Sequence, residues 1–216
     1  MTLTRDPSTD EYAAWKTARL GKVTASKLVD VIGQKKDGGW KAERKNYFYQ
    51  LVAERLTGMA PDGFFGGSML WGVETEPMAL KAYANRTGSL VTRVGFMDHG
   101  HIPMAGCSPD ALVDDDGLVE VKCTETRTLI RYRLERLVPE EYKIQMQWQM
   151  ACTGRRFCDF LTYDPRLPSN IAFYIVRVDR DDKLIKGLEK AVIAFNQEIE
   201  QAIESLDGGH IASEHV

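Results

Sequence analysis

The feature that most constrains the fold of this chain is the stretch Ala105–Cys123, AGCSPDALVDDDGLVEVKC. Two short apolar runs flank an Asp-Asp-Asp-Gly turn, a pattern that predicts a β-hairpin. Side chains alternate along a strand, so Glu120 and Lys122 share a face, and pairing of the hairpin brings Asp110 near them. Buried charges are costly unless they are paired or bind a metal. The hairpin therefore indicates chemistry, and the alternative is an edge hairpin with a solvated polar face.

The composition predicts one globular domain with a proper core. The chain has 216 residues, of which 44% are hydrophobic and 27% charged, and this length suits a single domain. No apolar run approaches the roughly 20 residues that span a membrane. The N-terminal sequence lacks the basic-then-apolar order of a signal peptide. The four cysteines show no metal-binding spacing, so we expect reduced thiols in a cytoplasmic protein without a membrane partner.

The charge is unevenly distributed, although the formal net charge is only -3. Residues 16–55 contain ten basic and four acidic side chains, whereas residues 179–216 contain nine acidic and four basic ones. One basic and one acidic side suit a directional site for a polyanion. Solvated helices account for the same asymmetry, so charge alone leaves both interpretations open.

The remaining pattern predicts helices around a mixed sheet, in an α/β or α+β arrangement. The expected helices are Asp10–Leu20, Lys27–Ile32, Lys41–Thr57, Gly72–Thr87, Arg127–Leu137, Pro139–Thr153 and Asp182–Leu206. The expected strands are Leu90–Asp98, Pro109–Val113, Leu118–Cys123, Arg156–Tyr163 and Ile171–Val178. Residues 207–216 are expected to form a frayed tail.

The hairpin carboxylates suit a hard cation. Asp110 and Glu120 offer oxygen ligands to magnesium, which needs only one or two protein carboxylates. Beside such a metal, Lys122 can orient or deprotonate a water, or neutralise developing negative charge. Glu76 is the best candidate for a third carboxylate, because it lies near the expected start of a helix that Pro77 also marks. Its alternative role is to stabilise that helix terminus by capping.

A second group of residues suits a phosphate. Arg19, Thr24 and Ser26 surround the start of a short helix, where free N–H groups favour anions. The alternative is simple capping of that helix by Thr24 or Ser26. Ser108, beside the strand of Asp110, offers a further hydroxyl.

The helix EYKIQMQWQMACTG carries a third group. Tyr142, Gln145 and Gln149 fall on one helical face. A glutamine on a helix is more commonly solvated surface than part of a site, so both interpretations stay open.

Taken together and in this order, these segments resemble the phage lambda exonuclease family, viral recombination exonucleases of the PD-(D/E)xK nuclease superfamily. The resemblance runs to about Val178. The segments are WKTARLGKVTAS (Trp15–Ser26), NYFYQLVAERLTG (Asn46–Gly58), LWGVETEP (Leu70–Pro77), CSPDAL (Cys107–Leu112), GLVEVKC (Gly117–Cys123), YKIQMQ (Tyr142–Gln147) and YDPR (Tyr163–Arg166).

The resemblance implies a role for each residue of the site. Asp110, Glu120 and the Val121 carbonyl would bind magnesium, for which manganese is a substitute. Lys122 would be the catalytic lysine of the D…E-x-K motif, and Glu76 would hold a second metal ion or the attacking water. The other implied residues are Gln145 to orient the lysine or water, Arg19, Thr24, Ser26 and Ser108 for the 5′-terminal phosphate, Met69 as a wedge and Lys35 and Lys36 as a basic loop on the duplex.

The resemblance also implies the activity. It predicts a PD-(D/E)xK core within a single nuclease domain, made of a mainly helical part (1–60), a catalytic sheet (90–180), a C-terminal helix (182–206) and a tail (207–216). The expected enzyme degrades one strand of duplex DNA in the 5′→3′ direction, as a ring-shaped homotrimer beside a single-strand annealing protein, in a bacterial host of a phage or prophage. The alternatives are a structure-specific or restriction-type endonuclease, a catalytically silent DNA-end-binding scaffold, and a purely structural α/β module.

Overall fold

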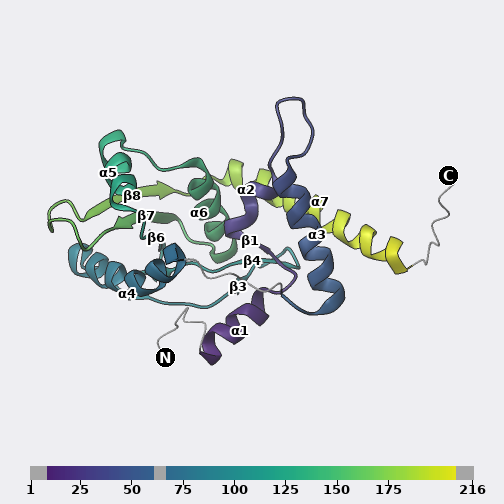
Figure 1. Ribbon diagram of the computed structural model, residues 1–216, viewed down its shortest axis with the longest axis horizontal. Helices are drawn as coiled ribbons and strands as arrows, with labels where there is room; N and C mark the ends of the chain where they lie inside the picture. Colours follow the sequence, from purple (N-terminus) through teal and green to yellow (C-terminus); the bar gives the residue numbers. More distant parts are fainter. Residues whose placement is uncertain (1–8, 61–66, 208–216) are drawn as a thin grey trace.

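The computed structural model describes residues 9–60 and 67–207, and its helices surround two β-sheets (Figure 1). The helices are α1 (Asp10–Arg19), the 3₁₀ helix η1 (Ala25–Lys27), α2 (Leu28–Val31), α3 (Ala42–Thr57), α4 (Gly67–Thr87), α5 (Thr126–Glu135), α6 (Glu140–Thr153) and α7 (Asp182–Asp207). The strands are β1 (Val23–Thr24), β2 (Val91–Thr92), β3 (Met97–Asp98), β4 (Ala105–Cys107), β5 (Ala111–Val113), β6 (Gly117–Lys122), β7 (Phe157–Tyr163) and β8 (Phe173–Asp179). Beyond residue 207, the expected tail lies outside the described residues.

The larger sheet has the order β2-β5-β6-β7-β8 and mixes parallel with antiparallel pairs. β5 and β6 form the predicted hairpin, in which Ala111 lies opposite Val119. β6 runs parallel to β7, and the connection between them contains α5 and α6. The mixed α/β architecture predicted from the sequence is therefore confirmed.

Helices cover both faces of this sheet. On one face, Tyr83 of α4 packs in a cluster with Val119 and Val121 of β6. On the other face, Met146 of α6 packs in a cluster with Leu118. Because side chains alternate along β6, its charged residues lie on the side of Leu118 and face α6.

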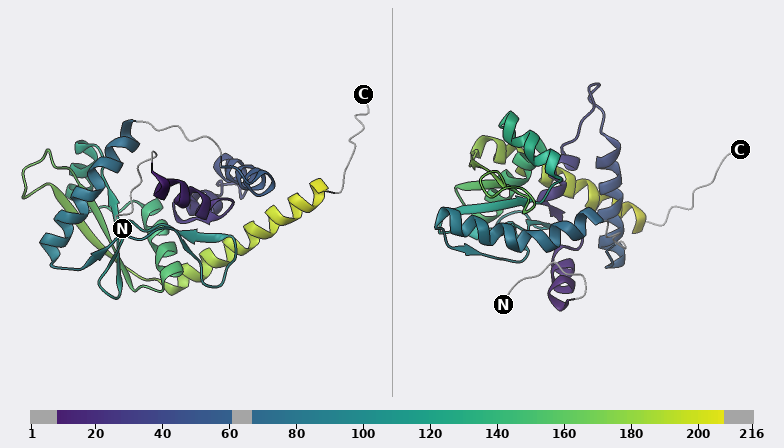
Figure 2. Two further views of the ribbon diagram at one scale, coloured as in Figure 1. Left: turned by 90° about the horizontal axis from the view of Figure 1, so that it is seen from below. Right: turned by 60° about the vertical axis from the view of Figure 1, so that its left-hand side comes forward.

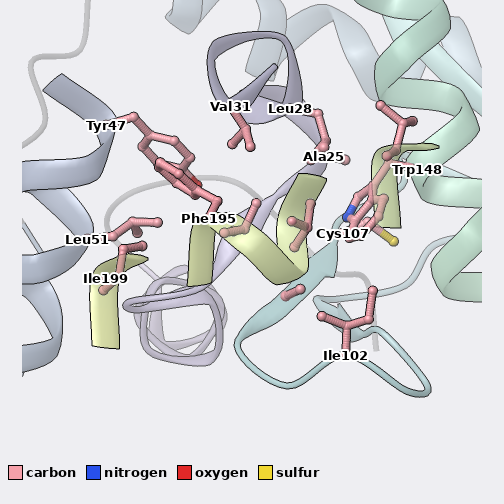
Figure 3. Packing of buried hydrophobic residues seen from close by; sticks show 14 of the residues in the cluster. Ala25, Leu28, Val31, Tyr47, Leu51, Ile102, Cys107, Trp148, Phe195 and Ile199 are labelled. Atoms are coloured by element: carbon pink, nitrogen blue, oxygen red, sulfur yellow. The ribbon is translucent and has the colours of Figure 1, made fainter. Parts of the chain in front are cut away.

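A separate hydrophobic cluster joins the smaller sheet β1-β4-β3 to α3, α6 and α7 (Figure 3). Tyr47 of α3 stacks on Phe195 of α7 with their ring centroids 6.0 Å apart. Trp148 of α6 and Cys107 of β4 are fully buried in the same cluster. Burial of such side chains stabilises the fold by about 25 cal/mol per Å² of apolar surface. The cluster therefore fixes α3 against the segment that carries β1.

The start of α4 differs from the prediction. The sequence places the helix start at Gly72 and treats Pro77 as an N-terminal signal, but α4 begins at Gly67 and contains Pro77 in its interior. A proline inside a helix removes the hydrogen bond to the carbonyl four residues earlier, which belongs to Val73, and its ring crowds that carbonyl, yet α4 continues through Pro77. Glu76 consequently lies beyond the first turn, and its alternative role as a helix cap is wrong.

Three short elements also differ from the prediction. The expected strand Leu90–Asp98 is two strands of different sheets, since β2 pairs with β5 and β3 with β4. β4 itself was not predicted, because three residues are too few to show alternation. The expected helix Lys27–Ile32 is the four-residue α2 preceded by η1. Short elements such as these depend on tertiary pairing rather than on local sequence pattern.

α7 is amphipathic, and its apolar side is buried as far as Ile199. Ala202 and Ile203 still pack against the core, and the C-terminal end of the helix extends past the rest of the structure (Figure 2). Within residues 9–60 and 67–207, no helix has the length and apolar character needed to cross a membrane.

Candidate active site

A cavity of about 590 Å³ lies where α1, α3 and α4 meet the end of β6. Figure 2 shows these three helices on the same side of the molecule. The charged residues of its lining are Lys16, Arg19, Lys22, Lys27 and Lys122 against Glu54 and Glu76. Because basic side chains outnumber acidic ones, the cavity favours an anionic ligand.

The glutamate and the lysine of β6 meet beside this cavity. Lys122 Nζ lies 2.6 Å from Glu120 Oε1, and the Glu120 side chain is 2% exposed while that of Lys122 is 23% exposed. The predicted common face of these two residues is confirmed. Lys122 lines the cavity, so it connects the buried carboxylate with the ligand space.

Two glutamines of α6 bind the same carboxylate. Gln145 Nε2 donates to Glu120 Oε1 at 2.8 Å, and Gln149 Nε2 donates to Glu120 Oε2 at 2.6 Å. Both glutamines are buried. Their predicted common face is confirmed, and the alternative of a solvated glutamine face is wrong. The third member of that face, Tyr142, has its ring centroid 4.6 Å from Lys122 Nζ.

The side chain of Asp110 is hydrogen-bonded to the backbone of β6. Its Oδ2 accepts a hydrogen bond from the Val121 N–H at 2.7 Å. β5 begins only at Ala111, so the Asp110 carboxylate takes the place of a strand hydrogen bond at this point. The predicted approach of Asp110 to the second strand of the hairpin is confirmed.

The surroundings of Glu120 and Lys122 shift the pKa of each. Burial and the neighbouring Asp110 raise the pKa of Glu120, and Lys122 opposes this rise. For Lys122, burial lowers the pKa, but Glu120 and Asp110 outweigh burial and raise that pKa to about 12. Lys122 is therefore a cation in this arrangement, which suits stabilisation of negative charge better than removal of a proton.

Glu76 of α4 lines the same cavity, and its carboxylate forms an ion pair with Arg93. Its Oε1 lies 2.6 Å from Arg93 Nη2. Glu76 is 7% exposed, and such a buried carboxylate needs a cationic partner. Arg93 is thus a neighbour of the site that sequence reasoning missed.

The donors suit a hard metal ion bound through few protein ligands. Asp110 and Glu120 lie close enough for Asp110 to raise the pKa of Glu120, and a divalent cation relieves such repulsion. Across the described ranges, no three His, Cys, Asp or Glu side chains are gathered as a metal site. Glu76 instead pairs with Arg93. The fit is therefore to an ion held by two carboxylates, a backbone carbonyl and water, as magnesium prefers.

The same cavity contains part of the predicted phosphate group. Arg19 and Thr24 both line it, and the Arg19 guanidinium stacks over Trp15 at 4.2 Å. Trp15 Nε1 in turn donates to Ser108 Oγ at 2.8 Å. Ser108 thus supports the cavity through Trp15, while Ser26 is exposed and neither serine is among the described residues that line the cavity.

Thr24 does not cap the helix that follows it. It occupies the N-cap position of η1 without a side-chain hydrogen bond. Its Oγ1 is buried and has no hydrogen-bond partner within the described part of the chain. A buried hydroxyl without a partner costs about 1–3 kcal/mol. The capping alternative is therefore wrong for Thr24, and the hydroxyl is available to a ligand.

The predicted basic loop does not contribute to the described lining of this cavity. Lys35 and Lys36 are exposed in the hairpin loop between α2 and α3, which projects from the body in Figure 1. Met69 belongs to the first turn of α4, and its side chain lies outside the described residues.

Besides Arg93, sequence reasoning left out two polar residues that belong to the site region. Gln149 was placed on the correct helical face, yet its bond to Glu120 was not predicted. Glu54 lines the cavity and falls on the apolar stripe of α3 with Tyr47 and Leu51. An acidic residue on an apolar stripe is the signal that could have revealed it.

The fold and the site together define the class of this protein. An aspartate before one strand, and a glutamate and a lysine on the adjacent strand of a mixed sheet, form the D…E-x-K motif of PD-(D/E)xK nucleases. Comparison with known proteins agrees with this class. The YqaJ-like viral recombinase domain matches residues 14–156. The chain belongs to this family, and the lambda exonuclease-like membership predicted from the sequence is confirmed.

Solved structures give the same result. The alkaline exonuclease LHK-Exo from Laribacter hongkongensis is 45% identical, with a TM-score of 0.84 over 90% of this chain and 96% of that one. LHK-Exo in complex with dAMP matches with 45% identity and a TM-score of 0.83, over 90% and 95% of the two chains. A phage-related exonuclease from Haemophilus somnus 129PT shares the fold at 19% identity, with a TM-score of 0.66 over 86% and 96%. No curated protein matches the chain.

Proposed function

We propose that this protein is a magnesium-dependent 5′→3′ exonuclease that degrades one strand of double-stranded DNA from its end. It releases 5′-mononucleotides and leaves a 3′ overhang for recombination by single-strand annealing. Family membership and the likeness to LHK-Exo support a DNA exonuclease. LHK-Exo has also been crystallised with dAMP, a nucleotide of the kind that we propose as product.

One observation carries the proposal: a single basic cavity is lined both by Arg19 and Thr24 and by Glu76 and Lys122. An anchor for a terminal phosphate and a cutting site in one cavity favour cleavage at a fixed distance from a DNA end. Because the anchor binds the 5′ phosphate, cleavage proceeds from the 5′ end. The proposed polarity thus rests on the proposed identity of this anchor as a 5′-phosphate site.

The metal chemistry rests on the residues of the hairpin. Magnesium, with manganese as a substitute, would be held by Asp110, Glu120 and the Val121 carbonyl, and a second ion by Glu76; bound there, it supplies a Lewis acid and an activated water. Lys122 neutralises negative charge that develops on the phosphodiester. Gln145, together with Gln149, holds the Glu120 carboxylate in place.

The proposed DNA contacts form two groups, one at the 5′-terminal phosphate and one along the duplex. Arg19 and Thr24 bind the 5′-terminal phosphate, Ser108 supports them through Trp15, and Ser26 is proposed as a further contact outside the described cavity lining. Lys35 and Lys36 contact the duplex backbone, and Met69 separates the strands. A guanidinium and hydroxyls recognise phosphate by charge-assisted hydrogen bonds, whereas lysines on a projecting loop bind the duplex without sequence preference.

We also propose the setting of this activity. The chain forms a single nuclease domain that assembles as a ring-shaped homotrimer around DNA. It hands the 3′ overhang to a single-strand annealing protein. It acts in the cytoplasm of a bacterial host and derives from a phage or prophage.

The site is tested by Lys122→Ala and Glu120→Ala. We expect each variant to lose at least about 100-fold in nucleotide release, because each removes a group that acts on the reacting phosphate or its metal. Binding to DNA ends without magnesium should stay measurable. Lys190→Ala, an exposed lysine of α7, is the matched control and should digest DNA normally. Normal release by either site variant would refute the assignment.

A structure-specific or restriction-type endonuclease on the same core is distinguished by topology of the substrate. We expect linear duplexes to be consumed in magnesium while covalently closed circles stay intact. Nicking or linearisation of the circle would favour the endonuclease instead.

A further inference from the structure

The turn between α1 and β1 connects Arg19 to Thr24, and α3 holds the backbone of this turn. Glu54 Oε2 accepts a hydrogen bond from the Gly21 N–H at 2.8 Å. Arg55 Nε donates to the Gly21 carbonyl at 2.9 Å. Both backbone polar groups of one residue are therefore bound by consecutive side chains of a single helix.

A second contact from α3 holds the next residues of the turn. The Tyr47 hydroxyl accepts from the Thr24 N–H at 3.1 Å and donates to the Lys22 carbonyl at 3.3 Å. Tyr47 is fixed in turn by its stacking on Phe195, as Figure 3 shows. α3 thus sets the backbone on the Thr24 side of the turn as well.

The conformation of Gly21 favours glycine at this position. Its φ is +68°, in the left-handed region that favours glycine. A Cβ at this position would lie 3.0 Å from Arg55 Cγ. The conformation of the turn therefore depends on a glycine and on the side chains that bind it.

Glu54 is the most informative of these contacts, because a carboxylate is unfavourable in a cavity that binds an anion. Its two oxygens are both used by the protein. Oε2 binds the Gly21 N–H, and Oε1 accepts from Gln50 Nε2 at 2.7 Å. The charge of Glu54 is thus directed to the turn rather than to a ligand.

The contacts continue from the turn into the body of the protein. Arg55 Nη2 donates to Asn196 Oδ1 of α7 at 2.6 Å. Asn196 Nδ2 then donates to the Pro103 carbonyl at 3.1 Å, in the segment that precedes β4 and Ser108. The turn is therefore tied through α7 to the segment that precedes β4.

We propose that Tyr47, Glu54 and Arg55 are positioning residues for recognition of the DNA 5′ end. They hold the turn so that Arg19 and Thr24 meet the terminal phosphate together, and this inference rests on the proposed function. None of the three needs to touch the DNA. A displacement of about 1 Å in such a pair of groups can cost up to about 100-fold in their joint effect.

The experiment measures binding of duplex ends that carry either a 5′ phosphate or a 5′ hydroxyl, by fluorescence anisotropy in EDTA. The readout is the ratio of the two affinities, which a general loss of folded protein does not change. The variants are Glu54→Ala, Glu54→Gln and Tyr47→Phe. Glu43→Ala, an exposed acidic residue at the start of α3, is the control for loss of one negative charge.

We expect Glu54→Ala to lower the preference for the phosphorylated end by about tenfold, because the turn loses one of its anchors. Glu54→Gln keeps an oxygen for the Gly21 N–H and should retain the wild-type ratio within about twofold, as should Glu43→Ala. Tyr47→Phe preserves the aromatic packing and removes only the hydroxyl. It should lower the ratio even if Glu54→Ala does not fold.

The outcomes separate this inference from the proposed function. Wild-type preference that survives both Glu54→Ala and Tyr47→Phe would overturn the positioning role alone. A higher preference in both Glu54→Ala and Glu54→Gln would also overturn it, since Glu54 would then act only by repelling the phosphate. A wild-type ratio near one would instead overturn the phosphate pocket itself, and the positioning role with it.

Discussion

At the scale of single residues, the site contains buried polar groups that do not stabilise the fold, which indicates that they serve the proposed function. Thr24 is the clearest example, because its hydroxyl is buried beside the cavity with no partner in the described part of the chain. Lys122 and Glu120 are similar, since a buried pair of this kind seldom stabilises a fold. Stability and function therefore make opposite demands at these positions.

Thr24→Val tests this opposition. Valine keeps the shape of threonine and removes the unpaired hydroxyl, so we expect the free energy of unfolding to rise by up to about 1 kcal/mol. The preference for 5′-phosphorylated ends should fall at the same time. Urea denaturation and end-specific binding measure the two effects, with Thr24→Ser as the control that retains the hydroxyl. A less stable variant with unchanged end preference would contradict this account.

Asp164, in the YDPR segment, has a structural role. It accepts hydrogen bonds from Arg166 Nε at 2.8 Å and from Thr126 Oγ1 at 2.5 Å. Hydrogen bonding from Arg166 lowers the pKa of Asp164 to about 2. Arg166 also lies over the Trp71 ring of α4 at 4.6 Å. The segment therefore links the β7–β8 loop to the helix that carries Glu76.

Asp164→Asn should lower the free energy of unfolding at neutral pH by about 1–2 kcal/mol. Because the folded-state pKa of Asp164 is depressed, its stabilisation is present above its ordinary pKa and is lost as the pH falls through about 2. The difference between wild type and variant should therefore shrink below about pH 4. Urea titrations at several pH values measure it, and a constant difference would be inconsistent with the depressed pKa.

At the scale of elements, α4 contributes to the cavity through a glycine in its interior. Gly72 lines the cavity, and a Cβ there would meet nothing within 4 Å. Glycine inside a helix costs up to about 1 kcal/mol relative to alanine. The open space suggests that this cost is tolerated because Gly72 leaves room for the ligand.

Gly72→Ala should raise the melting temperature, and Gly72→Leu should raise the KM for DNA by filling the cavity. Gly187→Ala is the matched control, because Gly187 is also a helical glycine at which a Cβ would meet nothing within 4 Å. It should give the same stabilisation without any change in KM. A normal KM for Gly72→Leu would show that this wall does not contact the substrate.

The sequence predicted long elements better than short ones, for a physical reason. The hairpin, α3, α6 and α7 show clear periodicity over several turns or residues. β4 and η1 are too short for periodicity, and their formation depends on partners distant in the chain. Pro77 misplaced the start of α4, because proline favours the first turn of a helix but here lies in the interior despite its cost.

The candidate site was predictable where its residues share one element. Glu120 with Lys122, and Gln145 with Gln149, follow directly from the period of a strand and of a helix. The ion pair of Glu76 with Arg93 and the contacts of Glu54 with Gly21 join separate elements. Such contacts follow only from the assembled fold.

At the scale of the whole molecule, the proposed ring requires more than one copy of the chain. Each chain has a mass of 24.4 kDa, so we expect a particle of three times that mass by light scattering. A ring that encloses DNA should also release few partly digested intermediates. A monomer with the same digestion pattern would show that the ring is not needed.

The most direct test of the central claim follows both strands of one linear duplex. One strand carries a 5′-phosphate and a label at its 5′ end, its complement begins with a 5′ hydroxyl and carries a different label, and digestion starts with magnesium. We predict that the first label is released at once as a mononucleotide, while the complement remains full length and single-stranded. Release of the first label only at the end of digestion, or as an oligonucleotide, would contradict a 5′→3′ exonuclease.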